Sequence, residues 1–134
     1  MTTIRVTADT NVLVRAVVAD DPEQAAEAAR LLREADLIAV PAVALCELVR
    51  VLISVYGFNA ADAASAVRAL TAASTLRCDR SAADAGLATL DAGGDFADGV
   101  IAFEGARLGA DVFATFDRKA ARLLDGVPPA SLVG

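Results

Sequence analysis

The stretch IRVTADTN at residues 4–11 decides the fold, because a short apolar run ends there at residues that favour a helix start. Residues 4–8 are partly β-branched and are typical of a short strand. Asp9, Thr10 and Asn11 follow directly, and these residue types cap the N-termini of helices. Strands that alternate with helices build parallel sheets. The stretch therefore predicts an α/β fold whose first strand ends at Asp9.

The same alternation continues along the chain. Two boundaries are sharply marked, by Asp21 and Pro22 at a helix start and by Gly109 at a helix end. No linker, repeat or low-complexity stretch interrupts the pattern, so we expect one domain over residues 1–134. The expected helices cover about 13–18, 22–34, 42–56, 60–73, 81–92, 97–108 and 118–124. The expected further strands cover 37–40, 75–78, 111–115 and 130–133.

Composition limits the class of protein. Hydrophobic residues make up 56% of the 134 residues and aromatics only 4%, which indicates a core of Ala, Val and Leu. No apolar run approaches the 18 or so residues of a membrane span, and the N-terminus lacks a signal-peptide pattern. The two cysteines form no CxxC pair. We therefore expect a cytoplasmic protein with no membrane partner.

Four acidic residues are the best candidates for chemistry, since the chain has no histidine. Asp9 and Asp117 each end an apolar strand, and parallel strands present their carboxyl ends to ligands. Glu47 interrupts the apolar segment 43–49, and Asp98 begins a helix that leads into the fourth strand. If the fold gathers these four carboxylates, they form a divalent-cation site.

Each acid also has a purely structural explanation. Asp9 and Asp117 could act only as helix caps. Asp95 could cap a helix while Asp98 complements the helix dipole. Glu47 could pair with an arginine one turn later, or face a cavity that holds a metal. The residues alone leave these alternatives open.

The chemistry of the side chains favours a hard cation. Clustered carboxylates repel one another, so protons or cations must fill such a cluster. Oxygen donors without imidazole favour Mg²⁺ or Mn²⁺ over zinc. Without histidine a Ser-His-Asp triad cannot form, and the chain has no phosphate-binding or dinucleotide-binding glycine motif.

The net charge of −6 excludes a broad basic surface for nucleic acid. Local basic patches remain, because cations stand close in sequence to three of the four acids. The candidates for contact with RNA phosphates are Arg15, Arg50, Arg118 and Lys119.

Four fragments in order resemble one known family. They are DTNVL at residues 9–13, LCELV at 45–49, DFADGVIA at 95–102 and TFDR at 115–118. Together they resemble the PIN-domain ribonucleases, specifically the VapC-like toxins of bacterial type II toxin-antitoxin modules, over essentially the whole chain. The resemblance implies a three-layer α/β PIN-like domain, with a central, mainly parallel sheet of four or five strands and about seven helices.

The resemblance also implies an activity, a Mg²⁺- or Mn²⁺-dependent endoribonuclease whose metal site and catalytic residues would be Asp9, Glu47, Asp98 and Asp117. Asn11 and Thr115 would support that site, and Asp95 matches an acid common in this subgroup, with its role open. RNA would be the substrate, a cognate small antitoxin the inhibitor, and a homodimer the assembly. Gly99 departs from the family pattern, where Ala is expected, and would loosen the first turn of its helix.

Three other functions remain open. A PIN nuclease of RNA processing outside a toxin-antitoxin pair would use the same acids. A receiver-like phosphoacceptor module also gathers acids at strand ends, but it needs paired acids after the first strand, where Asp9 stands alone. A non-catalytic interaction domain would not need all four acids.

Overall fold

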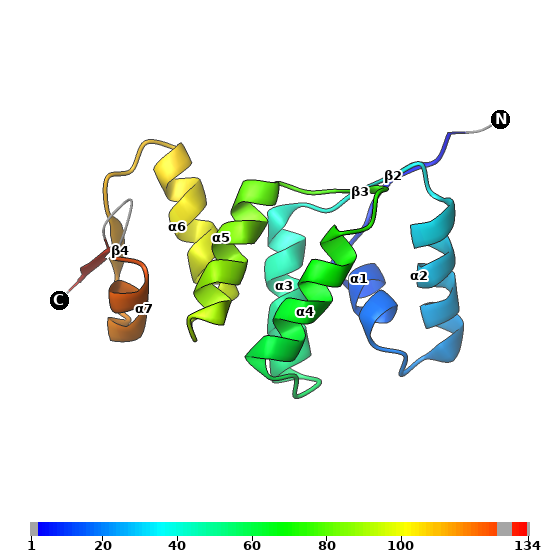
Figure 1. Cartoon of the computed structure of the whole chain (residues 1–134), viewed down its shortest axis with the longest axis horizontal. Helices are drawn as coiled ribbons and strands as arrows, with labels where there is room; N and C mark the ends of the chain where they lie inside the picture. The colour runs from blue at the N-terminus through cyan, green and yellow to red at the C-terminus, as the bar shows by residue number, and fades with distance from the viewer. Residues whose placement is uncertain (1–2, 126–129, 134) are drawn as a thin grey trace. The chain divides into compact units, whose positions relative to one another are not determined.

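The computed structural model describes residues 3–125 and 130–133 (Figure 1). The chain folds as two units, residues 1–79 and residues 80–134. Each unit contains helices and a parallel sheet of its own.

The first unit contains a three-stranded parallel sheet in the order β1-β2-β3. Val6 lies opposite Ile38 and Ile38 lies opposite Leu76, so Ile38 stands in the middle of the sheet and is fully buried. The elements of this unit are β1 (Arg5–Thr7), α1 (Thr10–Val17), α2 (Pro22–Glu34), β2 (Leu37–Ala39), α3 (Ala42–Ser54), α4 (Ala60–Thr71) and β3 (Leu76–Arg77).

Local sequence signals set where three of these helices begin. Asp9, Asp21 and Asn59 are the N-caps of α1, α2 and α4, and each side chain accepts a hydrogen bond from a backbone N–H of the first turn. Such a bond satisfies an N–H group that has no partner within the helix. Pro22 follows its cap because the first helical position needs no N–H donor.

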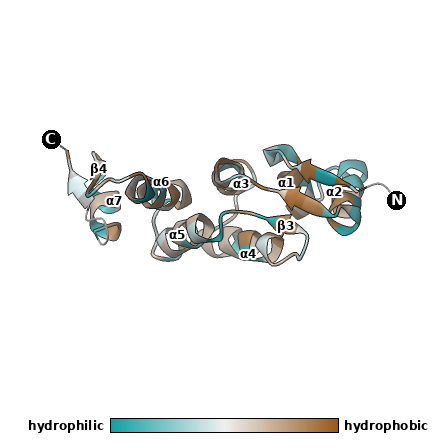
Figure 2. Ribbon diagram, turned by 90° about the horizontal axis from the view of Figure 1, so that it is seen from above, coloured by the Kyte–Doolittle hydropathy of each residue, from teal (hydrophilic) through white to brown (hydrophobic). Residues whose placement is uncertain are grey.

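The core of the first unit lies around α3, which packs on α1 and on α4. Figure 1 shows α3 beside α4, and α1 packs on both α2 and α3. In the hydropathy view α2 carries hydrophilic segments, consistent with its exposed charged residues (Figure 2). The largest fully buried side chains of this core are Leu13, Ile38, Val40, Leu45, Leu48, Leu52 and Val67.

The second unit combines a helical pair with a two-stranded parallel sheet. The helices α5 and α6 pack on each other along their length, and α7 packs on β4 and β5. Phe113, Ala114 and Thr115 lie opposite residues 130–132. Its elements are α5 (Arg80–Asp91), α6 (Phe96–Arg107), β4 (Phe113–Thr115), α7 (Arg118–Leu123) and β5 (Ala130–Leu132).

Glycine allows α5 and α6 to approach closely. A Cβ atom on Gly99 would lie 2.6 Å from the backbone oxygen of Ala85 and would also overlap the Thr89 side chain. A Cβ atom on Gly86 would lie 2.7 Å from the ring of Phe96, which is fully buried. The expectation that Gly99 loosens its helix is therefore replaced by a packing role, because a larger residue would separate the two helices.

The expected fold class is confirmed. Mixed α/β structure, seven helices and parallel strands all appear in the residues described, and the observed elements overlap the expected ones. The hydrogen bonds between strands form two sheets, of three and two strands, rather than one ladder of four or five. Within residues 3–125 and 130–133, every helix is too short or too polar for a bilayer crossing.

Candidate active site

Asp117 is held at the N-terminus of α7. Its Oδ1 accepts hydrogen bonds from the backbone N–H groups of Lys119 at 2.8 Å and Ala120 at 3.1 Å. Its own N–H donates to Oγ1 of Thr115 at 3.0 Å. Thr115 thus fixes the backbone that carries Asp117. The role expected for Thr115 in support of a metal site stays a prediction. Oδ2 of Asp117 takes no part in these bonds.

Asp95 and Asp98 come from the start of α6. Asp95 is the N-cap, and its Oδ1 accepts from the N–H of Ala97 at 3.4 Å. Asp98 lies in the first turn and is half-buried. Burial raises the pKa of Asp98 above its ordinary value, and the negative charges of Asp95 and Asp117 raise it further. A cation near Asp98 would relieve both effects.

One hollow of the second unit collects these acids. It has a volume of about 320 Å³ and is lined by Asp95, Asp98 and Asp117 together with Lys119. The ammonium of Lys119 lies over Gly93, 3.9 Å from where a Cβ atom of that glycine would stand. The hollow therefore offers carboxylate oxygens beside one flexible positive charge.

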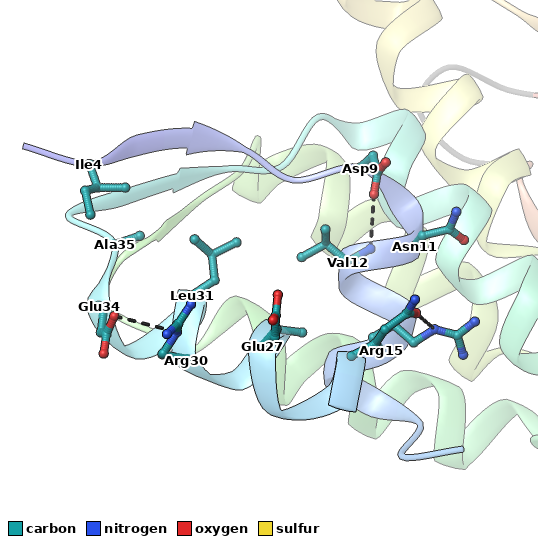
Figure 3. A pocket seen from close by; sticks show the side chains of 12 residues that line it. Ile4, Asp9, Asn11, Val12, Arg15, Glu27, Arg30, Leu31, Glu34 and Ala35 are labelled. Carbon is teal, nitrogen blue, oxygen red and sulfur yellow. Dashed lines mark hydrogen bonds and ion pairs between the residues drawn. The ribbon is translucent and has the colours of Figure 1, made fainter. Parts of the chain in front are cut away.

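Asp9 lies at one end of a larger cavity in the first unit, of about 560 Å³ (Figure 3). Its Oδ1 accepts from the N–H of Val12 at 3.1 Å, as expected for a helix cap. Asn11 and Arg15 contribute from α1, while α2 contributes a mixed apolar and charged wall. The residues of that wall are Gln24, Glu27, Ala28, Arg30, Leu31 and Glu34.

Arg15 is bound within its own unit. Its Nη1 donates to Oδ1 of Asp20 at 2.5 Å and to the Tyr56 hydroxyl at 3.3 Å, and its Nε donates to Oε1 of Gln24 at 2.9 Å. The Tyr56 hydroxyl donates in turn to Oδ2 of Asp20 at 2.9 Å. These bonds tie the α1–α2 connection to the end of α3. The RNA contact expected for Arg15 stays a prediction.

Glu47 pairs with Arg50 one turn later on α3. Nη2 of Arg50 donates to Oε2 of Glu47 at 2.5 Å, and the Glu47 side chain is 45% exposed. The bond and the charge of Arg50 lower the pKa of Glu47. The arginine-paired alternative is therefore the observed one. The apolar surroundings expected for Glu47 are not observed, because this face of α3 is partly exposed to solvent.

The carboxylates divide between the two units. Asp95, Asp98 and Asp117 share one hollow, while Asp9 lines a different cavity and Glu47 forms its ion pair. Among the residues that the structure describes, no group of three His, Cys, Asp or Glu side chains is arranged as a metal site. The expectation that all four predicted ligands act together stays a prediction.

Comparison with known proteins places the chain in a family. The sequence model of the PIN domain matches residues 6–124, which is most of the chain. The chain belongs to the PIN-domain family. No curated protein matches it in a sequence search. PIN domains are generally nucleases, and they generally use divalent metal ions.

The side chains present fit the chemistry of a PIN nuclease cation. All the candidate donors are carboxylate oxygens, which suit hard divalent ions. Burial and the charges of Asp95 and Asp117 raise the pKa of Asp98, and a bound cation would stabilise its ionised form. In this PIN domain Asp98 and Asp117 would hold the cation, with Asp95 beside them.

Two features of the PIN domain escaped the sequence analysis. The contact between Tyr56 and Asp20 joins residues 36 positions apart, and no local pattern indicates such a pair. Phe116 is 78% exposed immediately before Asp117, although phenylalanine in a strand-to-helix connection suggests burial. Only the exposure of Phe116 could have been predicted from the sequence, because Phe116 stands between a polar residue and a charged one.

Proposed function

We propose that this PIN domain is a Mg²⁺- or Mn²⁺-dependent endoribonuclease. The observation that carries the proposal is the hollow in which Asp95, Asp98 and Asp117 lie beside Lys119. It combines the two things that cleavage of a phosphodiester needs, namely donors for a hard cation and a positive charge for the phosphate.

The side chains of this hollow have different roles in the proposed reaction. Asp98 and Asp117 hold the cation, which when bound lowers the pKa of a water molecule and neutralises charge on the phosphate. The cap of α7 keeps Asp117 oriented, because its Oδ1 is bonded to two backbone N–H groups. Lys119 attracts the phosphate of the substrate into the hollow. We propose that Asp9 and Glu47 are required for the same reaction.

We further propose that the nuclease is the toxin of a type II toxin-antitoxin pair. The support is the resemblance of four sequence fragments, in order, to VapC-like toxins. The partners would then be RNA as substrate, a small antitoxin that blocks the acids, and a second copy of the chain in a homodimer. An inactive complex with the product of a neighbouring small open reading frame would distinguish this role from RNA processing.

A cleavage assay tests the activity. Purified protein is incubated with single-stranded RNA in Mg²⁺, in Mn²⁺ or in EDTA, beside the variants Asp98→Asn and Asp9→Asn. We expect cleavage with either metal, none in EDTA, and a loss of about a hundredfold or more in each variant, since metal and acid act together.

The matched control is Asp84→Asn, which removes an exposed carboxylate of α5 that does not line the hollow. It should cleave like the wild type. Metal-dependent cleavage that persists in Asp98→Asn would disprove the assignment of the site, and cleavage that persists in EDTA would disprove the metal dependence.

A further inference from the structure

Phe116 is the exposed aromatic side chain of this protein. The chain has five phenylalanines, one tyrosine and no tryptophan, and all six aromatic residues lie in the part of the chain that the structure describes. Phe96 is fully buried in its own unit and the other four are half-buried, whereas Phe116 is 78% exposed. Burial of an exposed apolar ring against a partner is favourable, because it removes apolar surface from water.

The backbone on one side of Phe116 is fixed by hydrogen bonds. The Thr115 hydroxyl accepts from the N–H of Asp117, and Asp117 in turn caps α7. A ring on such a backbone has only two side-chain torsions to restrict when it binds. The backbone that carries the Phe116 ring is therefore held in place before a partner binds.

The residues that follow Phe116 in the sequence are charged and exposed. Asp117 precedes Arg118 and Lys119, and all three are exposed. The cores of protein interfaces are depleted in Lys and Asp, so these neighbours disfavour a second protein as the partner. An exposed aromatic residue followed closely by exposed cations is instead a composition found in sites for single-stranded RNA, where bases stack on rings and cations hold phosphates.

We propose that Phe116 stacks against an unpaired base of the RNA and so sets which phosphodiester reaches Asp117. The inference rests on the proposed nuclease function. It adds a positioning residue that contacts the substrate without taking part in the metal chemistry. It also assigns the substrate a conformation, because a base inside a duplex cannot stack on a side chain in this way.

Three variants test the proposal by RNA binding in EDTA, where cleavage is prevented. The probe is a fluorescein-labelled single-stranded RNA of about ten nucleotides. Phe116→Leu keeps an apolar side chain but removes the ring. Phe116→Trp keeps a ring and supplies the only indole of the chain as a reporter. Leu108→Ala is the control, since Leu108 is 90% exposed in the same unit but lies at the opposite end of α6 from Asp98.

We expect Phe116→Leu to weaken binding about tenfold or more and to lower kcat/KM by a similar factor, as the loss of one stacked base requires. Phe116→Trp should bind within about twofold of the wild type, with its fluorescence quenched by RNA, because the larger ring still stacks. Leu108→Ala should bind like the wild type.

Two results would overturn the proposal while leaving the nuclease function intact. One is wild-type affinity and cleavage in Phe116→Leu, with or without a change of oligomeric state in light scattering. The other is unquenched fluorescence of Phe116→Trp at saturating RNA. A wild-type protein that neither binds nor cuts RNA would instead reject the proposed function itself.

Discussion

At the scale of single residues, Asp98 and Glu47 differ in how their charges are compensated. The pKa of Glu47 is lowered because Arg50, on the same helix, donates a hydrogen bond to it and supplies a positive charge. The pKa of Asp98 is raised because burial and two neighbouring carboxylates oppose its ionised form. The folded protein therefore disfavours the ionised form of Asp98 and stabilises the ionised form of Glu47.

The first prediction concerns Asp98→Asn in the absence of divalent metal. Because the folded protein disfavours the ionised form, ionisation of Asp98 destabilises the fold at neutral pH. The variant should therefore have a higher Tm than the wild type at pH 7. The difference should shrink as the pH falls through the raised pKa of Asp98, since the wild-type carboxylate then becomes neutral. Thermal unfolding between pH 7 and pH 4 measures it.

Mg²⁺ supplies the comparison for that experiment. It should raise the Tm of the wild type and of Asp84→Asn, but raise that of Asp98→Asn much less, because binding to the folded state stabilises it. A lower Tm of Asp98→Asn at pH 7 without metal would contradict the charge assignment.

Residue types predicted the local contacts of the site but not its distant ones. The caps made by Asp9 and Asp117 follow from side chains that reach backbone groups two or three positions away. The Glu47–Arg50 pair was one of two alternatives, because helical spacing allows the contact without requiring it. The grouping of Asp95 and Asp98 with Asp117 depends on how segments distant in the sequence come together around one hollow, which the residues alone could not determine.

At the scale of elements, the packing of α5 on α6 positions the start of α6, where the acidic residues Asp95 and Asp98 stand. The close approach of these helices depends on Gly99, because a Cβ atom at this position would force the backbone of α5 to move. The boundaries of these helices were predicted closely from Gly93 and Gly109, since both glycines have positive φ and end a helix. The closeness of the helices was not predicted, because it is a property of two segments together.

The second prediction compares two glycines of α6. Gly99→Ala should lower the free energy of unfolding by about 1–3 kcal/mol, the usual range for an overpacked site. Gly105→Ala should leave it unchanged or raise it by up to about 1 kcal/mol, because alanine favours helix and a Cβ atom there meets nothing within 4 Å. Urea unfolding of both variants measures the difference. Equal effects would show that helix propensity, and not packing, decides the outcome.

At the scale of the whole molecule, the order of strands and helices was predictable from sequence and the pairing of strands was not. Hydrophobic runs and capping residues are local, so elements such as α2 and α6 appear within two residues of their expected bounds. Which strands hydrogen-bond to one another depends on contacts across the chain. The expected single ladder therefore gave way to two sheets, β1-β2-β3 and β4-β5.

The third prediction follows from the net charge of −6. RNA must be held by a few cations near the acids rather than by a broad basic surface, so its binding should depend only moderately on salt. The slope of the logarithm of the association constant for RNA against the logarithm of the salt concentration should lie near about −1 to −2. Each phosphate neutralised on a single strand contributes about −0.7 to this slope. Lys119→Gln should reduce its magnitude by about 0.7. A slope steeper than about −4 would contradict this, because it would require many more phosphate contacts.

The close packing at Gly86 and Gly99 has a consequence in genetic terms. Every missense change at these two codons adds at least a Cβ atom, so no substitution there is free of the overlaps with Phe96, Ala85 or Thr89. If the activity is harmful to its host, selection for surviving cells should recover mutations at codons 86 and 99 beside those of the acidic residues. The set of inactivating mutations would then identify the contact between α5 and α6 independently of the structure.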